Sequence, residues 1–275
     1  MMKEKILGTK LAKGQIALFY LGQVGFIVKY EEKYLLVDGY LSDYVDQNCC
    51  SELVKWVRKY PAPIKAEELD FVDYVLCTHP HFDHADPDTL SKLARVNKKA
   101  RYVVSAANVS LLTGYGVKGT DILGLCAHKE TVLEQGIAVT AIPAAHEEFH
   151  TDEKGDFVEV GFRIVLGDTV LFHAGDGCPY EGLAACVKGA DVLMLPINGR
   201  DHYRTKVCDI IGCFDSREAV LFAKEVGAKL LIPTHFDLYD VNGVNPAHFV
   251  DTLKALSFDQ CFHIFAPGER YIYMK

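Results

Sequence analysis

The sequence lacks the cysteine arrangement of a disulfide-bonded protein, although it contains 9 cysteine residues. The number is odd, the spacing is irregular, and there is no CxxC pair. Cys77 lies inside an apolar run, where a thiol packs as a small hydrophobic side chain. We therefore expect free thiols in a reducing compartment such as the cytoplasm.

The sequence also lacks an export signal and a long apolar run. Its most apolar early stretch, residues 16–28, is interrupted by Gly22, Gln23 and Gly25, and no small-residue cleavage site follows it. A helix needs roughly 20 apolar residues to cross a bilayer, and this stretch is shorter. These absences predict a cytoplasmic protein that has no membrane partner.

Positive charge is in the minority, with 29 Lys and Arg residues against 37 Asp and Glu residues and a formal net charge of −8. A protein that binds nucleic acid through its phosphates needs a basic surface. The acidic balance therefore argues against nucleic acid, or another long polyanion, as the partner of this chain.

No linker rich in Pro, Gly or Ser divides the chain, and its composition does not shift along its length. Hydrophobic residues make up 49% and charged residues 24% of the sequence, which is typical of globular proteins. A chain of 275 residues is long enough to bury a sizeable core. We predict a single domain over residues 1–275.

Hydrophobic patterning predicts strands at the front of the chain and alternating strands and helices at the back. The expected strands cover residues 16–21, 26–30, 34–37, 74–77, 102–104, 132–133, 137–142, 158–165, 170–172, 192–195 and 230–232. The expected helices cover residues 51–60, 107–113, 217–226 and 246–256, with another that is capped by Asp86 or Asp88 and runs through Val96. This order favours sheets covered by helices.

Three histidines and one aspartate occur within six residues, directly after the expected strand at 74–77. They are His79, His81, Asp83 and His84, and Pro80 stiffens the loop between the first two. Imidazoles so close together would repel one another when protonated, unless a cation holds them neutral. The alternative is a solvated histidine-rich loop, and we favour a metal site.

A metal ion needs about four or more ligands, so others must come from elsewhere in the chain. His146, Asp176 and His235 each follow an apolar strand. Three such residues at equivalent positions, in a chain that already needs ligands, are predicted to complete the site.

Residues 196–206 form a candidate substrate-binding loop after another buried strand. Its candidate contacts are Asn198, Arg200, Tyr203 and Arg204. An arginine side chain can hold a phosphate or carboxylate with two parallel hydrogen bonds. A solvated surface loop is the alternative, and the sequence does not separate the two.

The motif His-x-His-x-Asp-His, followed by a distant histidine, an aspartate in a Gly-Asp-Gly turn and a final histidine, resembles the metallo-β-lactamase superfamily. The resemblance covers most of the chain, from about Gln15 to about Leu256. It implies an α/β (α+β) four-layer αββα sandwich, the metallo-β-lactamase fold, with two divalent metal ions at one edge of the sheets.

The resemblance also implies a role for each candidate ligand. It assigns His79, His81 and His146 to one metal ion and Asp83, His84 and His235 to the other, with Asp176 bridging the two. Asp38 matches the structural aspartate that supports the histidine loop from behind. His173 is expected to form a hydrogen bond with Asp176 or with a ligand.

Within the superfamily, the sequence resembles the L-ascorbate-6-phosphate lactonase group. The shared motifs are YLGxxG at residues 20–25, THxHxDH at 78–84, HxGD at 173–176 and AKLLIPxH at 228–235. The chain is shorter than those lactonases and lacks most of their terminal additions. The resemblance implies a homo-oligomer and a small anionic substrate.

We therefore expect a hydrolase that uses a water molecule activated by two divalent metal ions, Zn, Mn or Fe. The expected substrate is a small anionic lactone or ester, such as a sugar-phosphate lactone. Asp83 and Asp176 are the expected catalytic carboxylates, with Asp83 either a ligand or a proton carrier.

Three alternatives remain. A phosphodiesterase or nuclease of the same fold is disfavoured by the acidic balance of the chain. A di-iron oxidoreductase is disfavoured because His81 stands where those proteins have glutamate. A non-catalytic metal-binding protein is disfavoured by the complete set of candidate ligands.

Overall fold

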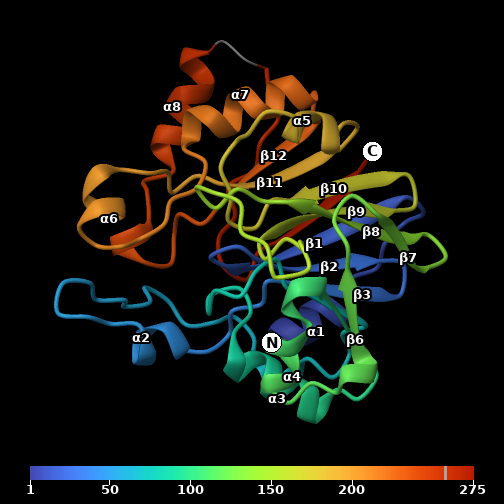
Figure 1. Cartoon of the computed structure of the whole chain (residues 1–275). Coiled ribbons are helices and arrows are strands. Elements are labelled where there is room, and N and C mark those ends of the chain that lie inside the picture. Colours follow the sequence, from blue (N-terminus) through green and yellow to red (C-terminus); the bar gives the residue numbers. More distant parts are fainter. Residues whose placement is uncertain (257–258) are drawn as a thin grey trace.

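The computed structural model describes residues 1–256 and 259–275, and it contains two β-sheets between two layers of helices (Figure 1). The strands of the first sheet are β1 (Gln15–Gly22), β2 (Gly25–Tyr30), β3 (Lys33–Val37), β4 (Tyr74–Leu76), β5 (Arg101–Ser105), β6 (Ile122–Leu125) and β13 (Arg270–Met274). They lie in the order β13-β1-β2-β3-β4-β5-β6. The pairs β3–β4, β4–β5 and β5–β6 are parallel, and the others are antiparallel.

The second sheet has six strands. They are β7 (Glu130–Glu134), β8 (Ile137–Pro143), β9 (Val160–Leu166), β10 (Thr169–His173), β11 (Val192–Pro196) and β12 (Leu230–Thr234). Their order is β12-β11-β10-β9-β8-β7, and β10, β11 and β12 run parallel to one another. The carboxyl ends of these three strands therefore lie at the same edge of the sheet.

The strands form layers because their side chains alternate between two apolar environments. In β3, Leu35 and Val37 face the core between the sheets, whereas Leu36 faces the helices. In β11, Met194 faces the inner core and Leu193 faces the opposite helical layer. Successive side chains of a strand point to opposite faces, so strands that are apolar throughout are buried on both sides.

Helices cover the outer face of each sheet, below and above the two sheets in Figure 1. The first sheet is covered by α1 (Met2–Leu7), α3 (Pro87–Val96) and α4 (Val109–Gly114), and the second by α5 (Leu183–Cys186), α7 (Ser216–Val226) and α8 (Ala247–Ala255). The short helices α2 (Tyr44–Asn48) and α6 (His202–Lys206) lie on one side of the molecule, at the left of Figure 1. The predicted sheets covered by helices are thus confirmed.

The helix predicted over residues 51–60 is wrong, because this segment is extended and irregular. Two of its apolar side chains, Leu53 and Val57, are 54% and 67% exposed, so the apolar positions do not form one buried face. The backbone N–H of Arg58 donates to Asp46 Oδ1 at 2.7 Å rather than to a carbonyl one turn back. Tertiary contacts therefore override the helical spacing of the sequence.

Several elements have no counterpart in the predicted set. The strands are β6 and β13, and the helices are α1, α2, α5 and α6. β13 pairs antiparallel with β1, with Gln15 opposite Met274, and it forms one edge strand of the first sheet. In the ranges that the structure describes, no helix is long and apolar enough to cross a bilayer.

The core between the two sheets gives a test of this arrangement. Leu171 of β10 is 0% exposed within that core, whereas Leu221 of α7 is 43% exposed. We expect Leu171→Ala to lower the free energy of unfolding by about 2–5 kcal/mol, because it leaves a cavity. The control Leu221→Ala should change it by less than about 0.5 kcal/mol. Urea denaturation of the chelator-treated proteins measures both values, and equal losses would contradict the two-sheet core.

Candidate metal centre

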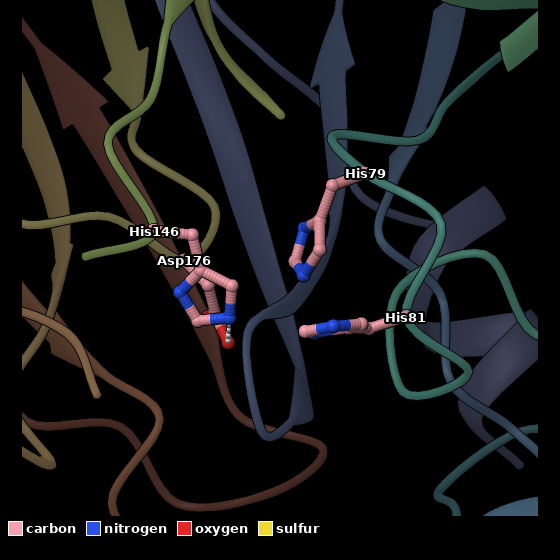
Figure 2. Close-up of side chains that lie close together, drawn as sticks. All are labelled: His79, His81, His146 and Asp176. Atoms are coloured by element: carbon pink, nitrogen blue, oxygen red, sulfur yellow. Dashed lines mark ion pairs between the residues drawn. The ribbon is translucent and has the colours of Figure 1, made fainter. Parts of the chain in front are cut away.

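The candidate ligands lie at one edge of the two sheets, on loops that follow different strands. His79, His81, Asp83 and His84 follow β4, His146 follows β8, Asp176 follows β10 and His235 follows β12. They form two groups, His79–His81–His146–Asp176 and Asp83–His84–His235, and within each group the potential ligand atoms lie within 4.8 Å of one another. Figure 2 shows the first group, with His79 and His81 facing His146 and Asp176 across a small gap.

The buried carboxylate of Asp38, just after β3, fixes the histidine loop. Its Oδ1 accepts the backbone N–H of Thr78 at 2.8 Å, and its Oδ2 accepts the Thr78 hydroxyl at 2.6 Å. Oδ2 also accepts Nδ1–H of His84 at 2.9 Å. Asp38 has a positive φ of 44°, which a non-glycine residue adopts only where its surroundings hold it. The sequence-based role of Asp38 as a support of this loop agrees with these contacts.

These contacts determine which ring nitrogens are free. The Thr78 hydroxyl donates to Asp38, so its oxygen is left to accept Nδ1–H of His79 at 3.0 Å. His84 likewise uses its Nδ1 on Asp38. Both rings therefore present Nε2, and in each case this atom is buried without a hydrogen-bond partner among the described residues. A buried nitrogen with no partner is costly, and a metal ion would satisfy it.

Asp176 lies between the two groups. Its Oδ1 is 3.3 Å from Nε2 of His84, while its Oδ2 is 3.2 Å from Nε2 of His235 and 4.0 Å from Nε2 of His146. Gly175 has a φ of +60°, and a Cβ there would lie 2.7 Å from Thr78. Only glycine allows this turn to pack against the fixed histidine loop, which brings Asp176 to its place.

The charges of the metal-free site are strongly coupled. Burial would raise the pKa of Asp176, but His235 and His84 outweigh it and hold that pKa well below its usual range. Burial would lower the pKa of His235, but the Asp176 and Asp83 carboxylates raise it to about 10. Burial lowers the pKa of His146 to about 4, against the opposing effect of Asp176. Without metal, the site is thus held by protonated and neutral histidines around ionised carboxylates.

His173 lies behind the ligands, but it does not contact Asp176 as a hydrogen-bond partner. Its Nε2 donates to the carbonyl of Val24 at 2.8 Å, and its Nδ1 accepts the N–H of Gly175 at 3.2 Å. Burial lowers the pKa of His173, which agrees with a neutral ring that both donates and accepts. The ring is therefore linked to Asp176 by hydrogen bonding through the turn at Gly175.

Gln23, in the turn between β1 and β2, is a part of the site that the sequence did not indicate. Its Nε2 donates to Asp83 Oδ2 at 2.8 Å and lies 3.1 Å from His235 Nε2. Its carbonyl accepts the backbone N–H of His235 at 2.7 Å. Gln23 and His235 both have positive φ values, 58° and 56°. A lone glutamine in a glycine-containing turn carries no spacing signal, so only the fold reveals this contact.

A cavity of about 370 Å³ opens over the two ligand groups. Its apolar wall consists of Val45, Trp56, Phe82, Ile210 and Ile211, and Asp83, His146, Asp176 and His235 lie in its lining as well. Trp56 and Ile210 come from segments that the sequence did not connect with the site. A volume of this size suits a small ligand.

The four residues predicted to contact the substrate are not among those that line this cavity. The Arg200 guanidinium pairs with Glu218 and donates to the carbonyl of Cys213 at 2.6 Å. The Arg204 guanidinium pairs with Asp201, the N-cap residue of α6. Asn198 is 1% exposed and Tyr203 is 57% exposed. The segment contributes to the cavity through residues 209–211, just beyond the predicted loop.

Known proteins are similar to this chain in sequence and in fold. A family model described as a beta-lactamase superfamily domain matches residues 34–236. A UPF0173 metal-dependent hydrolase of Archaeoglobus fulgidus is 28% identical over 78% of this chain and 87% of its own length. Another, from Methanoregula boonei, is 30% identical over 72% of this chain and 81% of its own length.

The solved structure of Igni18, a metallo hydrolase from Ignicoccus hospitalis, superposes with a TM-score of 0.72 at 20% identity. The match covers 95% of this chain and 99% of that one. The fold predicted from the sequence is confirmed, while the comparisons support the superfamily rather than the lactonase group within it. The chain belongs to the metallo-β-lactamase superfamily of metal-dependent hydrolases.

Proposed function

We propose that this hydrolase holds two divalent metal ions and cleaves a small ester or lactone with water. The observation that carries the proposal is the position of Asp176. Its two oxygens lie 3.3 Å from His84 and 3.2 Å from His235 of the second group, and Oδ2 also lies 4.0 Å from His146 of the first. A carboxylate placed in this way can serve two ions at once. The Nε2 atom of His79, which is buried without a hydrogen-bond partner among the described residues, supports the same conclusion, because imidazole nitrogen suits Zn, Mn and Fe.

Within this proposal, His79, His81 and His146 would hold one ion and Asp83, His84 and His235 the other, with Asp176 available to both. Bound ions would lower the pKa of a water molecule to about 7 and polarise the bond under attack. Side chains of the protein would have to accept and release the protons of the reaction.

Asp83 is the carboxylate that we assign to proton handling. Burial would raise its pKa, but His84 and His235 outweigh burial and keep the pKa well below its usual value. Asp83 is therefore ionised at neutral pH, and it lines the cavity where a substrate would lie. The amide of Gln23 holds Oδ2 at 2.8 Å, so the carboxylate is fixed in direction. An ionised, oriented acceptor suits a proton leaving the attacking water.

The volume of the cavity suits a small ester or lactone. The residues that line it give little support for an anionic group on the substrate. Among the described residues, no lysine or arginine lines the cavity. Arg200 and Arg204 are already engaged by Glu218 and Asp201. The same lack of cationic side chains disfavours a phosphodiesterase or nuclease, whose substrate carries charged phosphates.

The number of metal ions can be tested with one ligand from the second group. We expect the wild-type protein to hold two ions per chain and His235→Ala to hold one, because the first group stays complete. His248→Ala changes an exposed histidine of α8 and should keep both ions. Elemental analysis after dialysis measures the content. A wild-type protein that binds a single ion, or none, would refute the two-metal proposal.

Hydrolysis itself can be tested at Asp176. We expect Asp176→Ala to lower kcat/KM for a lactone or ester by more than about a hundredfold, because metal ions supply several kcal/mol of transition-state stabilisation. Circular dichroism should show an unchanged fold, since the side chain lies in a loop after β10. Full activity of Asp176→Ala would rule out its bridging role.

The metal-free protein should also show a characteristic pH dependence. The pKa of His235 is raised to about 10 in the folded state and is about 6.5 in an unfolded chain. A raised pKa contributes stability that is complete below about pH 6.5 and is lost as the pH rises through 10. We therefore expect the Tm of the chelated wild type to fall more steeply between pH 7 and pH 10 than that of His235→Gln.

Scanning calorimetry of the two metal-free proteins measures this difference. Metal binding competes with the proton on His235, so the increase in Tm on adding metal should grow over the same pH range. Parallel Tm curves for the wild type and His235→Gln would show that the histidine is not protonated in the folded state.

A further inference from the structure

The wall of the cavity is apolar and well fixed. Val45 and Ile210 are each 6% exposed, so this part of the wall is packed from behind, whereas Ile211 is 37% exposed at the rim. The Trp56 ring stands edge-on to Tyr239, with ring centroids 5.2 Å apart. These contacts preform the wall, and a preformed apolar surface binds apolar groups without a large ordering cost.

The charges around the cavity disfavour an anionic substituent. Apart from the candidate ligands, Asp209 is the charged residue in its lining, as far as the described residues go. The neighbouring Arg58 is turned away, because its Nη1 donates to the carbonyl of Ser42 at 2.6 Å. An anionic group on this wall would meet the Asp209 carboxylate and no lysine or arginine side chain, so an uncharged group is favoured there.

Asn242 supplies a neutral hydrogen-bond donor to the same cavity. Its Oδ1 accepts Nδ2–H of Asn198 at 3.0 Å and Nη1–H of Arg204 at 3.2 Å. Because its oxygen is used by these two donors, the amide must present its NH₂ group on the other side, and Asn242 lines the cavity. Asn198 and Arg204, which the sequence suggested as direct substrate contacts, thus orient a residue of the cavity instead.

From these observations we propose that the substrate is an uncharged ester or lactone whose apolar chain lies against Val45, Trp56, Phe82, Ile210 and Ile211. This inference rests on the proposed hydrolytic function and names its substrate class. Water adds to the carbonyl carbon, and the bond between this carbon and the alkoxy oxygen of the ester breaks. The products are a carboxylate, an alcohol and one proton. The Asn242 amide is placed to donate to a polar oxygen of the bound substrate.

A series of p-nitrophenyl esters from acetate to octanoate tests the substrate class on the metal-loaded protein. We expect kcat/KM to rise about three- to fourfold per methylene group until the cavity is filled, which corresponds to about 0.8 kcal/mol per group. A matched ester whose chain ends in a carboxylate should be cleaved at least about tenfold more slowly than its uncharged counterpart. A flat series, or a preference for the charged ester, would overturn the proposal.

Two isoleucines of equal exposure provide a matched pair of variants. Ile211, in the cavity lining, is 37% exposed, and Ile272, on the edge strand β13, is 38% exposed. Ile211→Asp should lower kcat/KM for the octanoate ester at least about tenfold more than for the acetate ester, because it places a charge beside the chain. Ile272→Asp should leave the dependence on chain length unchanged. The same loss of chain-length dependence in both variants would contradict the assignment of the wall.

Binding can be followed without turnover, because Trp56 is the single tryptophan of the chain. We expect octanamide to change the Trp56 emission in a saturable way, and acetamide to have no effect at the same concentrations. Equal responses to acetamide and octanamide, or none to octanamide, would overturn the apolar assignment. If octanamide binds but no ester is cleaved with any metal, the hydrolytic proposal fails while the apolar cavity stands.

Discussion

The carboxylate of Asp38 is the contact on which the rest of the site depends. It is fully buried, and it accepts hydrogen bonds from the backbone and the hydroxyl of Thr78 and from the ring of His84. Thr78 then fixes the ring of His79, so a single carboxylate orients two candidate ligands. A hydrogen-bonded group behind a ligand sets both its direction and its basicity. This contact joins the end of β3 to the loop after β4.

The site gathers buried histidines and carboxylates whose charges are strongly coupled. His84, for example, has a pKa raised well above its ordinary value: burial opposes the proton, but the Asp176, Asp83 and Asp38 carboxylates outweigh burial. The positive φ values of Gln23, Asp38 and His235 add local backbone strain. A fold tolerates such features where the two-sheet core holds both sides of the site in place.

The sequence predicted those features that arise from residue type and short spacing. Alternating apolar residues gave most of the strands, and the histidine motif gave the candidate ligands, which the fold brings together. Features that depend on long-range packing were missed. Residues 51–60 have helical spacing, yet they lie extended beside the site, and they supply Trp56 to the cavity.

The arginines of the predicted substrate loop show the same limit of the sequence. Residue type suggested that Arg200 and Arg204 bind an anion, but Glu218 and Asp201 are close enough in the fold to occupy them. Only the arrangement of neighbouring elements reveals that these charges are already satisfied. The substrate class that we propose therefore rests on the lining of the cavity rather than on the composition of one loop.

The central claim is that two metal ions lie on either side of Asp176. Anomalous diffraction from crystals of the manganese-loaded protein tests it most directly. We expect two peaks about 3.5–4 Å apart, one among His79, His81 and His146 and the other among Asp83, His84 and His235. A single peak at full loading, or peaks away from Asp176, would contradict the account.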